Sequence, residues 1–331
     1  MKSLLRGIIN VCVFMFVALI FVGCGENTKN NVKANDKQVA TNKIEESVHT
    51  IRIAYLPITH SLPILEEAEA SADNLLTGIK VELVRFGSWP ELLDAINSGD
   101  VDGAVVLAEL AMKLRETQGN NSIKAVALGH RDGNVIVVSK EINSFSDLKG
   151  KVFAIPHRQS SHHILVREAM KKNGMTEKDI KLIELSPTEM PASLYSGKIA
   201  GYSVAEPFGA MSVNLGIGKV LYTSEQLWPN SICCLLVLRS AFIEKHYQLA
   251  KNFVKGFKDA GIHLGNHEYA LKVAVKYFKQ NTKVLQNSLQ WIHFDDLELT
   301  KNNYESLVNK TVEYGLTSAP PTYEEFVENE L

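Results

Sequence analysis

The sequence has 331 residues, of which 45% are hydrophobic, 22% charged and 8% aromatic. This is ordinary globular composition, and it excludes a disordered, collagen-like or disulfide-rich chain. The formal net charge of −2 argues against a nucleic-acid partner, because nucleic-acid binders need clustered basic side chains. The length allows about two domains of roughly 100–200 residues each.

Residues 1–23 have the features of a secretory signal peptide. Lys2 and Arg6 precede an almost wholly apolar stretch, residues 8–22. This stretch is shorter than the roughly 20 residues that a permanent membrane-spanning helix needs. A basic start, a short apolar stretch and a small residue before a cut site predict export.

The end of this segment, Phe21-Val22-Gly23-Cys24, resembles the lipobox of bacterial lipoproteins. We therefore predict that Cys24 is lipidated and anchors the chain at the extracytoplasmic face of the cell membrane. An ordinary signal peptide or an uncleaved anchor, with Cys24 incidental, is the alternative. Residues 24–50 are polar and rich in Asn and Lys, so we expect a flexible tether.

From residue 51 the chain alternates between short apolar strands and amphipathic helices. This alternation predicts mostly parallel sheets that are covered on both faces. The first run has expected strands at 51–55, 80–85, 103–107 and 123–128, with helices at 62–70, 90–97 and 108–116. The second run has strands at 151–155, 181–185 and 201–204, with helices at 160–172, 190–195 and from 207. The remainder is expected to be helical, over 241–264, 268–280, 283–291 and 299–314.

An internal similarity supports two lobes of related build. Residues 96–106 and 194–204 both have an apolar residue two positions before a Ser-Gly pair, and then a second Gly and a strand. In each segment a helix ends at the first Gly and a buried strand follows. Open parallel sheets bind ligands at the carboxyl ends of their strands, and two facing lobes close around a ligand by hinge motion.

The cysteines give little chemistry when read from the sequence. Cys12 belongs to the signal segment and Cys24 is the lipid candidate, so only Cys233-Cys234 remains in the folded part. Adjacent cysteines form only a strained disulfide, so we expect none. Without a nearby His in the sequence the pair is a weak metal site, and we interpret it as part of a buried apolar strand, residues 233–238.

Four segments carry a resemblance to a known family. They are residues 55–60 (YLPITH), 154–162 (AIPHRQSSH), 201–210 (GYSVAEPFGA) and 231–234 (SICC). They resemble, in this order, the first-strand loop, the opening of the second lobe, the Glu-Pro-Phe segment and the returning strand of a family of substrate-binding proteins. Those proteins serve nitrate, sulfonate, taurine and bicarbonate ABC importers, and their relatives bind thiamine-type pyrimidines. The similarity spans about residues 51–264.

The resemblance implies an α/β protein with the type II periplasmic-binding-protein fold. Such a protein has two Rossmann-like lobes, a hinged cleft and, here, a helical C-terminal tail packed on the first lobe. Lobe I would comprise residues 51–137 and 234–331, and lobe II residues 138–233, with crossovers near 135–140 and 230–235. The implied partners are a small-molecule ligand and an ABC permease and ATPase on separate chains.

The ligand-binding candidates follow strand ends or begin helices. Those positions face the expected cleft, and helix N-termini offer free N–H groups to a ligand. Ser61 is expected to cap the helix that follows it. His162 and His163 are adjacent, so only one of them is expected to face the cleft. The candidates are Thr59, His60, Ser61, Ser88, Trp89, Glu109, His130 and Arg131 in the first lobe, and His157, Arg158, Ser160, Ser161 and Glu206 in the second.

Two ligand classes stay open. Arg131, Arg158 and the helix N-termini favour a small oxyanion or a sulfonate. A planar nitrogen heterocycle such as a thiamine-type pyrimidine is favoured by Tyr55, Trp89, Glu109 and Glu206, because carboxylates accept hydrogen bonds from ring N–H groups. The histidines near strand ends also permit a metal-assisted site, but without closely spaced carboxylates we expect no metal and no cofactor.

The function expected from these features is that of an extracytoplasmic solute-binding component of an ABC importer, and not an enzyme. The sequence lacks a Gly-x-Ser-x-Gly elbow, a His-Glu-x-x-His motif and a Walker loop. Relatives of the family include a pyrimidine-forming synthase, whose chemistry would need a Schiff-base lysine and a cysteine-rich iron segment. A membrane-tethered ligand sensor is the alternative from another class.

Overall fold

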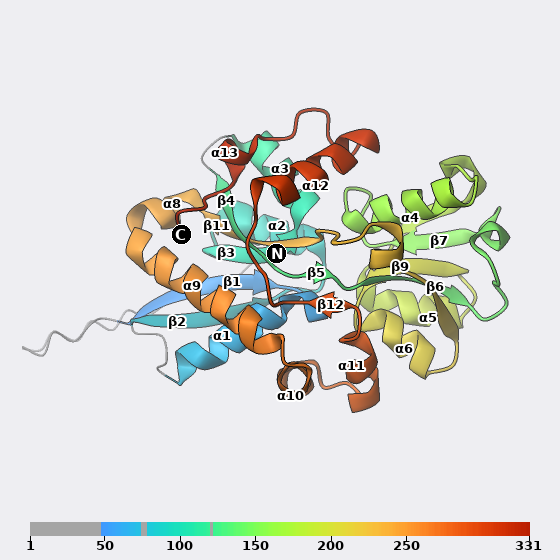
Figure 1. Ribbon diagram of the computed structural model, residues 1–331, viewed down its shortest axis with the longest axis horizontal. Coiled ribbons are helices and arrows are strands. Elements are labelled where there is room, and N and C mark those ends of the chain that lie inside the picture. The colour runs from blue at the N-terminus through green and yellow to red at the C-terminus, as the bar shows by residue number, and fades with distance from the viewer. Residues whose placement is uncertain (1–47, 74–77, 120–121) are drawn as a thin grey trace, which may run out of the picture. The chain divides into compact units, whose positions relative to one another are not determined.

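The computed structural model describes residues 48–73, 78–119 and 122–331 (Figure 1). The expected signal peptide, Cys24 and almost all of the expected tether lie outside these residues. All described residues belong to one compact unit that begins at Glu46. Within the described ranges, no helix has the length and hydrophobicity that crossing a membrane requires.

The first lobe is built on a five-stranded sheet with the order β2-β1-β3-β11-β4. Strands β1, β2 and β3 are parallel, and β11 runs antiparallel between β3 and β4. The strands are β1 (His49–Tyr55), β2 (Ile79–Arg85), β3 (Gly103–Leu107), β4 (Ile123–Leu128) and β11 (Cys234–Arg239), and the connecting helices are η1 (Thr59–Ser61), α1 (Leu62–Ala72), α2 (Trp89–Ser98) and α3 (Ala108–Gln118).

The second lobe repeats this plan with the order β8-β7-β9-β6-β10, in which β6 is the antiparallel strand. Its strands are β6 (Asn134–Ser139), β7 (Val152–Ile155), β8 (Lys181–Glu184), β9 (Gly201–Ala205) and β10 (Gly218–Thr223). Its helices are η2 (Phe145–Leu148), α4 (Ser161–Lys172), η3 (Glu177–Asp179), η4 (Pro187–Glu189), α5 (Met190–Tyr195), α6 (Phe208–Asn214) and α7 (Ser224–Leu227).

Two glycines explain the internal similarity in the sequence. Gly103 and Gly201 begin the middle strands β3 and β9, where the antiparallel strands β11 and β6 lie very close. A Cβ on Gly103 would meet the Val237 carbonyl oxygen at 2.5 Å, and one on Gly201 would meet the Val137 oxygen at 2.7 Å. Each lobe therefore needs glycine at the same place in the same strand arrangement.

The chain crosses between the lobes twice, and the two crossing segments lie side by side. The Asp132 side chain accepts hydrogen bonds from the Ser224 hydroxyl and from the N–H and hydroxyl groups of Ser231. The Gly129 N–H donates to the Cys234 carbonyl oxygen at 2.8 Å. The second sheet begins at Asn134, a little before the expected lobe boundary at residue 138.

The C-terminal tail packs on the first lobe, as the sequence resemblance implied, and it also contacts the second lobe. Helix α1 packs against α9 and α10, and α11 packs against α6 of the second lobe. Lys171 pairs with Glu313 at 3.1 Å and Lys310 pairs with Glu168, which ties α12 to α4. The tail elements are α8 (Ser240–Lys245), α9 (Tyr247–Leu264), α10 (His267–Phe278), α11 (Thr282–Ser288), α12 (Lys301–Glu313) and α13 (Tyr323–Phe326), and the short strands β5 (Arg131–Asp132) and β12 (Ile292–His293) pair with each other.

Candidate functional site

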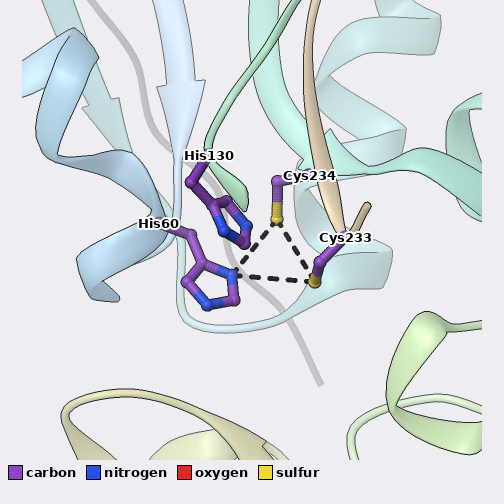
Figure 2. A group of neighbouring side chains, drawn as sticks. All are labelled: His60, His130, Cys233 and Cys234. Atoms are coloured by element: carbon purple, nitrogen blue, oxygen red, sulfur yellow. Dashed lines mark hydrogen bonds between the residues drawn. The ribbon is translucent and has the colours of Figure 1, made fainter. Parts of the chain in front are cut away.

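Four metal-ligating side chains meet at one edge of the first sheet, as Figure 2 shows: His60, His130, Cys233 and Cys234. His60 follows β1, His130 follows β4, and the cysteines lie at the start of β11. Because β11 is antiparallel to both β3 and β4, its first residues lie at the carboxyl ends of β1, β3 and β4. We call these four residues the His-Cys cluster.

The His-Cys cluster is compact and fully buried. The His60 Nδ1 atom lies 3.7 Å from the Cys233 sulfur and 3.6 Å from the Cys234 sulfur, and the two sulfurs are 3.8 Å apart. The ring of His130 stacks on that of His60, with centroids 3.6 Å apart. All four ligand atoms lie within 4.8 Å of one another.

One hydrogen bond fixes the protonation of His60. Its Nε2 atom lies 3.2 Å from the carbonyl oxygen of Gly133. A carbonyl only accepts hydrogen bonds, so Nε2 carries the proton in neutral His60 and the Nδ1 lone pair points toward the sulfurs. Burial, and after it the neighbouring His60, lower the pKa of His130 to about 4, so His130 is neutral near pH 7.

The two thiols differ in their ionisation. Burial opposes ionisation of Cys233, but a hydrogen bond from Cys234 and the nearby rings of His162 and His60 hold its pKa well below the ordinary value. Burial and the adjacent Cys233 raise the pKa of Cys234 well above its ordinary value. Cys233 therefore ionises before Cys234, and both cysteines are free of disulfide bonds.

Side chains from the second lobe complete this region. Ser161 and His162 form the first turn of α4, and among the described residues neither side chain has a hydrogen-bond partner. Burial lowers the pKa of His162 to about 4, and its ring lies near Cys233 and His60. Glu109, at the start of α3, is buried as well, and burial followed by the charge of Cys233 raises its pKa well above the ordinary value.

Thr59 and Glu206 join the lobes directly. The N–H and the hydroxyl of Thr59 donate to the Glu206 carbonyl oxygen at 2.8 and 3.1 Å. The Glu206 side chain accepts from the Ala210 N–H at 2.8 Å, so it holds the start of α6. Burial raises its pKa to about 7, against an opposing effect of the Ala210 and Gly209 amides.

Ser88, Trp89 and His157 line a different part of the space between the lobes. They border a cavity of about 620 Å³ together with Glu184 and Thr188. Trp89 is itself buried in the core, and the His157 Nδ1 atom accepts from the Gln159 N–H at 3.0 Å. Ser160, a candidate that is expected at a helix start, caps α4 by accepting a hydrogen bond from the His163 N–H.

Several candidates point elsewhere. Arg131 binds Asp296 at 2.9 Å, and the guanidinium of Arg158 donates to the Leu182 carbonyl oxygen at 2.9 Å. The prediction that Ser61 caps α1 is wrong, because its hydroxyl donates back to the Leu56 carbonyl oxygen instead.

The adjacent residues His162 and His163 point in different directions. His163 is held by Glu177 and by the Arg158 carbonyl oxygen, so His162 is the member of the pair beside the His-Cys cluster. The structure adds His162, Cys233 and Cys234 to the sequence candidates. No local motif connects them, because their nearest partners are far away along the chain.

Comparison with known proteins assigns the family. Residues 45–276 match the sequence profile of the NMT1-like family. The chain belongs to the NMT1-like family. The predicted resemblance is thereby confirmed, as is the two-lobed periplasmic-binding-protein architecture.

Named relatives of this NMT1-like chain include transport proteins. The taurine-binding periplasmic protein of Escherichia coli is 32% identical over 199 residues, which are 58% of this chain and 60% of that protein. The nitrate import ATP-binding protein NrtC of Synechocystis is 25% identical over 63% of this chain and 34% of its own length. The matched part thus spans about a third of that longer protein.

Solved structures agree on the fold. The ligand binding component of an ABC-type import system from Staphylococcus aureus, solved with zinc bound, has a TM-score of 0.81 and 38% identity, covering 85% of this chain and 97% of that one. The nitrate-binding protein NrtA from Synechocystis has a TM-score of 0.74 at 17% identity, covering 82% and 83%. The similarity to NrtA shows a shared fold and nothing more.

Proposed function

We propose that this chain is the solute-binding component of an ABC importer, which captures a small solute between its lobes and delivers it to a membrane permease. One observation carries the proposal. Buried polar side chains without partners among the described residues come from both lobes: Glu109 and His130 from the first, Ser161 and His162 from the second. Burying polar groups without partners is costly, and a solute enclosed between the lobes would supply those partners.

The relatives support the same role. They include a taurine-binding periplasmic protein, and the Staphylococcus aureus structure is of an import component. We place the permease and the ATPase on separate chains, and we place this chain at the extracytoplasmic face of the membrane through lipidated Cys24. Relatives in this family are transport binding proteins, and we propose no catalysis.

The candidate residues do not distinguish between the two solute classes. The oxyanion interpretation rests on Arg131 and Arg158, and both guanidinium groups are engaged by protein groups. The heterocycle interpretation rests partly on Trp89 and Glu206, which are buried in the core and bonded to α6 respectively. Both alternatives therefore belong in the experiment.

The test is a thermal-unfolding screen of the full chain with taurine, nitrate, bicarbonate, a thiamine-type pyrimidine and ZnCl₂. A bound solute raises the unfolding temperature, because it stabilises the folded state by RT ln(1 + [L]/Kd). Mass spectrometry should recover that solute unchanged, whereas turnover would support an enzyme. Unimpaired uptake of the same solute after gene deletion would support a sensor.

A matched pair of variants locates the effect. Ser161→Ala removes a buried hydroxyl without a described partner, whereas Ser196→Ala changes an exposed serine on the same lobe. The proposal expects the stabilisation by solute to shrink in Ser161→Ala and to persist in Ser196→Ala. Equal stabilisation in both variants would remove α4 from the binding site.

A further inference from the structure

We propose that His60, His130, Cys233 and Cys234 bind a transition-metal ion of the zinc class, and that this ion is the solute. The inference rests on the proposed function, since it names the solute class for the same region. It is carried by the geometry of the His-Cys cluster, by the donor atoms that the cluster presents and by its place in the fold.

The distances match those of a tetrahedral zinc site. Zn–S bonds of about 2.3 Å and Zn–N bonds of about 2.0–2.1 Å place two sulfurs about 3.8 Å apart, and a sulfur and a nitrogen about 3.6 Å apart. The two cysteine sulfurs are 3.8 Å apart, and His60 Nδ1 lies 3.6 and 3.7 Å from them. Three edges of the tetrahedron thus exist without any movement of the protein.

The donors are held in place by their surroundings. Gly133 accepts from Nε2 of His60, which leaves Nδ1 as the free ligand atom and fixes the ring. The carbonyl oxygens of Cys233 and Cys234 accept from the N–H groups of Ala108 and Gly129, both at 2.8 Å. His130 supplies the fourth ligand, and neither of its ring nitrogens makes a hydrogen bond to another described residue.

The donor set selects the metal. Two cysteine thiolates, which lose their protons when the metal binds, and two imidazoles in tetrahedral arrangement suit Zn²⁺, whereas Mg²⁺, Ca²⁺ and Mn²⁺ prefer oxygen ligands. The space among the four donor atoms, all within 4.8 Å of one another, has the size of a single ion. The His60 and His130 rings, whose centroids lie 3.6 Å apart, would move apart so that a nitrogen of each ring faces the ion.

The position of the cluster argues for a captured ion over a structural one. The strands that carry the cluster are already joined by the sheet, so the fold needs no ion to connect them. The cluster lies at the carboxyl ends of the strands, where α/β sheets bind ligands. His162 of the second lobe lies near Cys233 with both ring nitrogens unpartnered among the described residues, so a second-lobe side chain lies beside the site of the ion.

The experiment titrates the full chain, purified with a non-thiol reductant, with ZnCl₂ in competition with a coloured chelator. We expect one Zn²⁺ per chain, with binding weakened at least about 100-fold by Cys233→Ser/Cys234→Ser and at least about 10-fold by His130→Asn. His293→Asn changes an exposed histidine and should bind as the parent chain does. Far-UV circular dichroism of each variant shows whether it has folded.

The absorption spectrum of bound Co²⁺ reports thiolate ligands directly, which a measurement of folding cannot do. Co²⁺ in the parent chain should show the intense sulfur-to-metal absorption of two thiolate ligands, and Cys234→Ser alone should reduce it by about half. Zinc binding that is equally tight in the double cysteine variant, or a cobalt spectrum without thiolate absorption, would overturn the metal site.

The two proposals can fail separately. If taurine or nitrate stabilises the chain and ZnCl₂ does not, the inference is overturned and the importer function stands. If zinc binds through the cysteines but gene deletion leaves zinc uptake unchanged, the role of zinc as the solute is overturned. A binding site that needs His162 supports the inference, because a structural ion within the first lobe would not require that residue.

Discussion

The side chains of Cys233 and Cys234 point the same way because strand β11 begins between these two residues. Successive side chains in a strand point to opposite faces, but Cys233 precedes β11 and only Cys234 belongs to it. The irregular backbone at Cys233 lets both sulfurs approach His60. If β11 began one residue earlier, at Cys233, the two cysteine side chains would point to opposite faces of the sheet. Only one sulfur could then approach His60.

His162 and His163 allow a second prediction about single residues. His163 makes two hydrogen bonds, so His163→Leu should lower the free energy of unfolding by about 1–3 kcal/mol and leave solute affinity nearly unchanged. His162 has no described partner, so His162→Leu should change stability little but weaken zinc binding. Urea unfolding and zinc titration of both variants check this. Equal effects of the two substitutions on both measurements would contradict it.

Glu206 predicts a pH dependence of stability. Burial raises its pKa from an ordinary 4.5 to about 7, so the folded chain holds a proton that the unfolded chain releases within this window. The free energy of unfolding should therefore fall as pH rises from 4.5 to 7. At about 1.4 kcal/mol per pKa unit, the contribution of Glu206 is on the order of 3 kcal/mol.

The measurement is urea unfolding of the parent chain and Glu206→Gln across that pH range. Glutamine resembles the protonated carboxyl, so the variant should lose much of the decline in stability toward neutral pH. Indistinguishable pH profiles for the two chains would show that Glu206 does not titrate in this way.

At the scale of elements, the close approach of the antiparallel strands can be tested at Gly103. An added Cβ would lie 2.5 Å from the Val237 carbonyl oxygen, so Gly103→Ala should destabilise the fold by about 1–3 kcal/mol through overpacking. Gly87 has only a Glu91 oxygen near its Cβ position, at 3.7 Å, so Gly87→Ala is the matched control. Thermal unfolding compares them, and equal unfolding temperatures would refute the packing argument.

Most elements could be predicted from the sequence, because helix starts and buried strand runs have local patterns. The expected strand at 123–128 and helix at 190–195 match β4 and α5. The strands β6 and β10 had no predicted counterpart. Both pair antiparallel within the second lobe, and their place follows from the chain crossing between lobes, which no local pattern marks.

The arrangement of the candidate site was partly predictable for a related reason. Strand ends locate His60, Glu109 and His130, because parallel strands present their carboxyl ends at one edge. The position of a strand end does not determine the direction in which a long side chain points. Arg131 is therefore a candidate from the sequence, but in the structure its guanidinium binds Asp296. The cysteine pair was interpreted as apolar core, because its histidine neighbours are brought near only by the folded sheet.

At the scale of the whole molecule, the lobes and the tail form a connected body around the cleft. Thr59 binds Glu206 across the lobes, and α12 of the tail is tied to α4 by Lys171 and Lys310. Helix α4 also carries Ser161 and His162. Movement of the second lobe would therefore carry these two side chains toward or away from the His-Cys cluster, as the proposed function requires.

The most direct measurement is uptake of radiolabelled zinc by cells in which the gene for this chain is deleted and then restored. Restoring the parent chain should return uptake, whereas Cys233→Ser/Cys234→Ser should leave it at the deletion level and His293→Asn should behave as the parent. Immunoblotting confirms equal amounts of the three chains. Equal zinc uptake with the parent chain and the double cysteine variant would contradict the account.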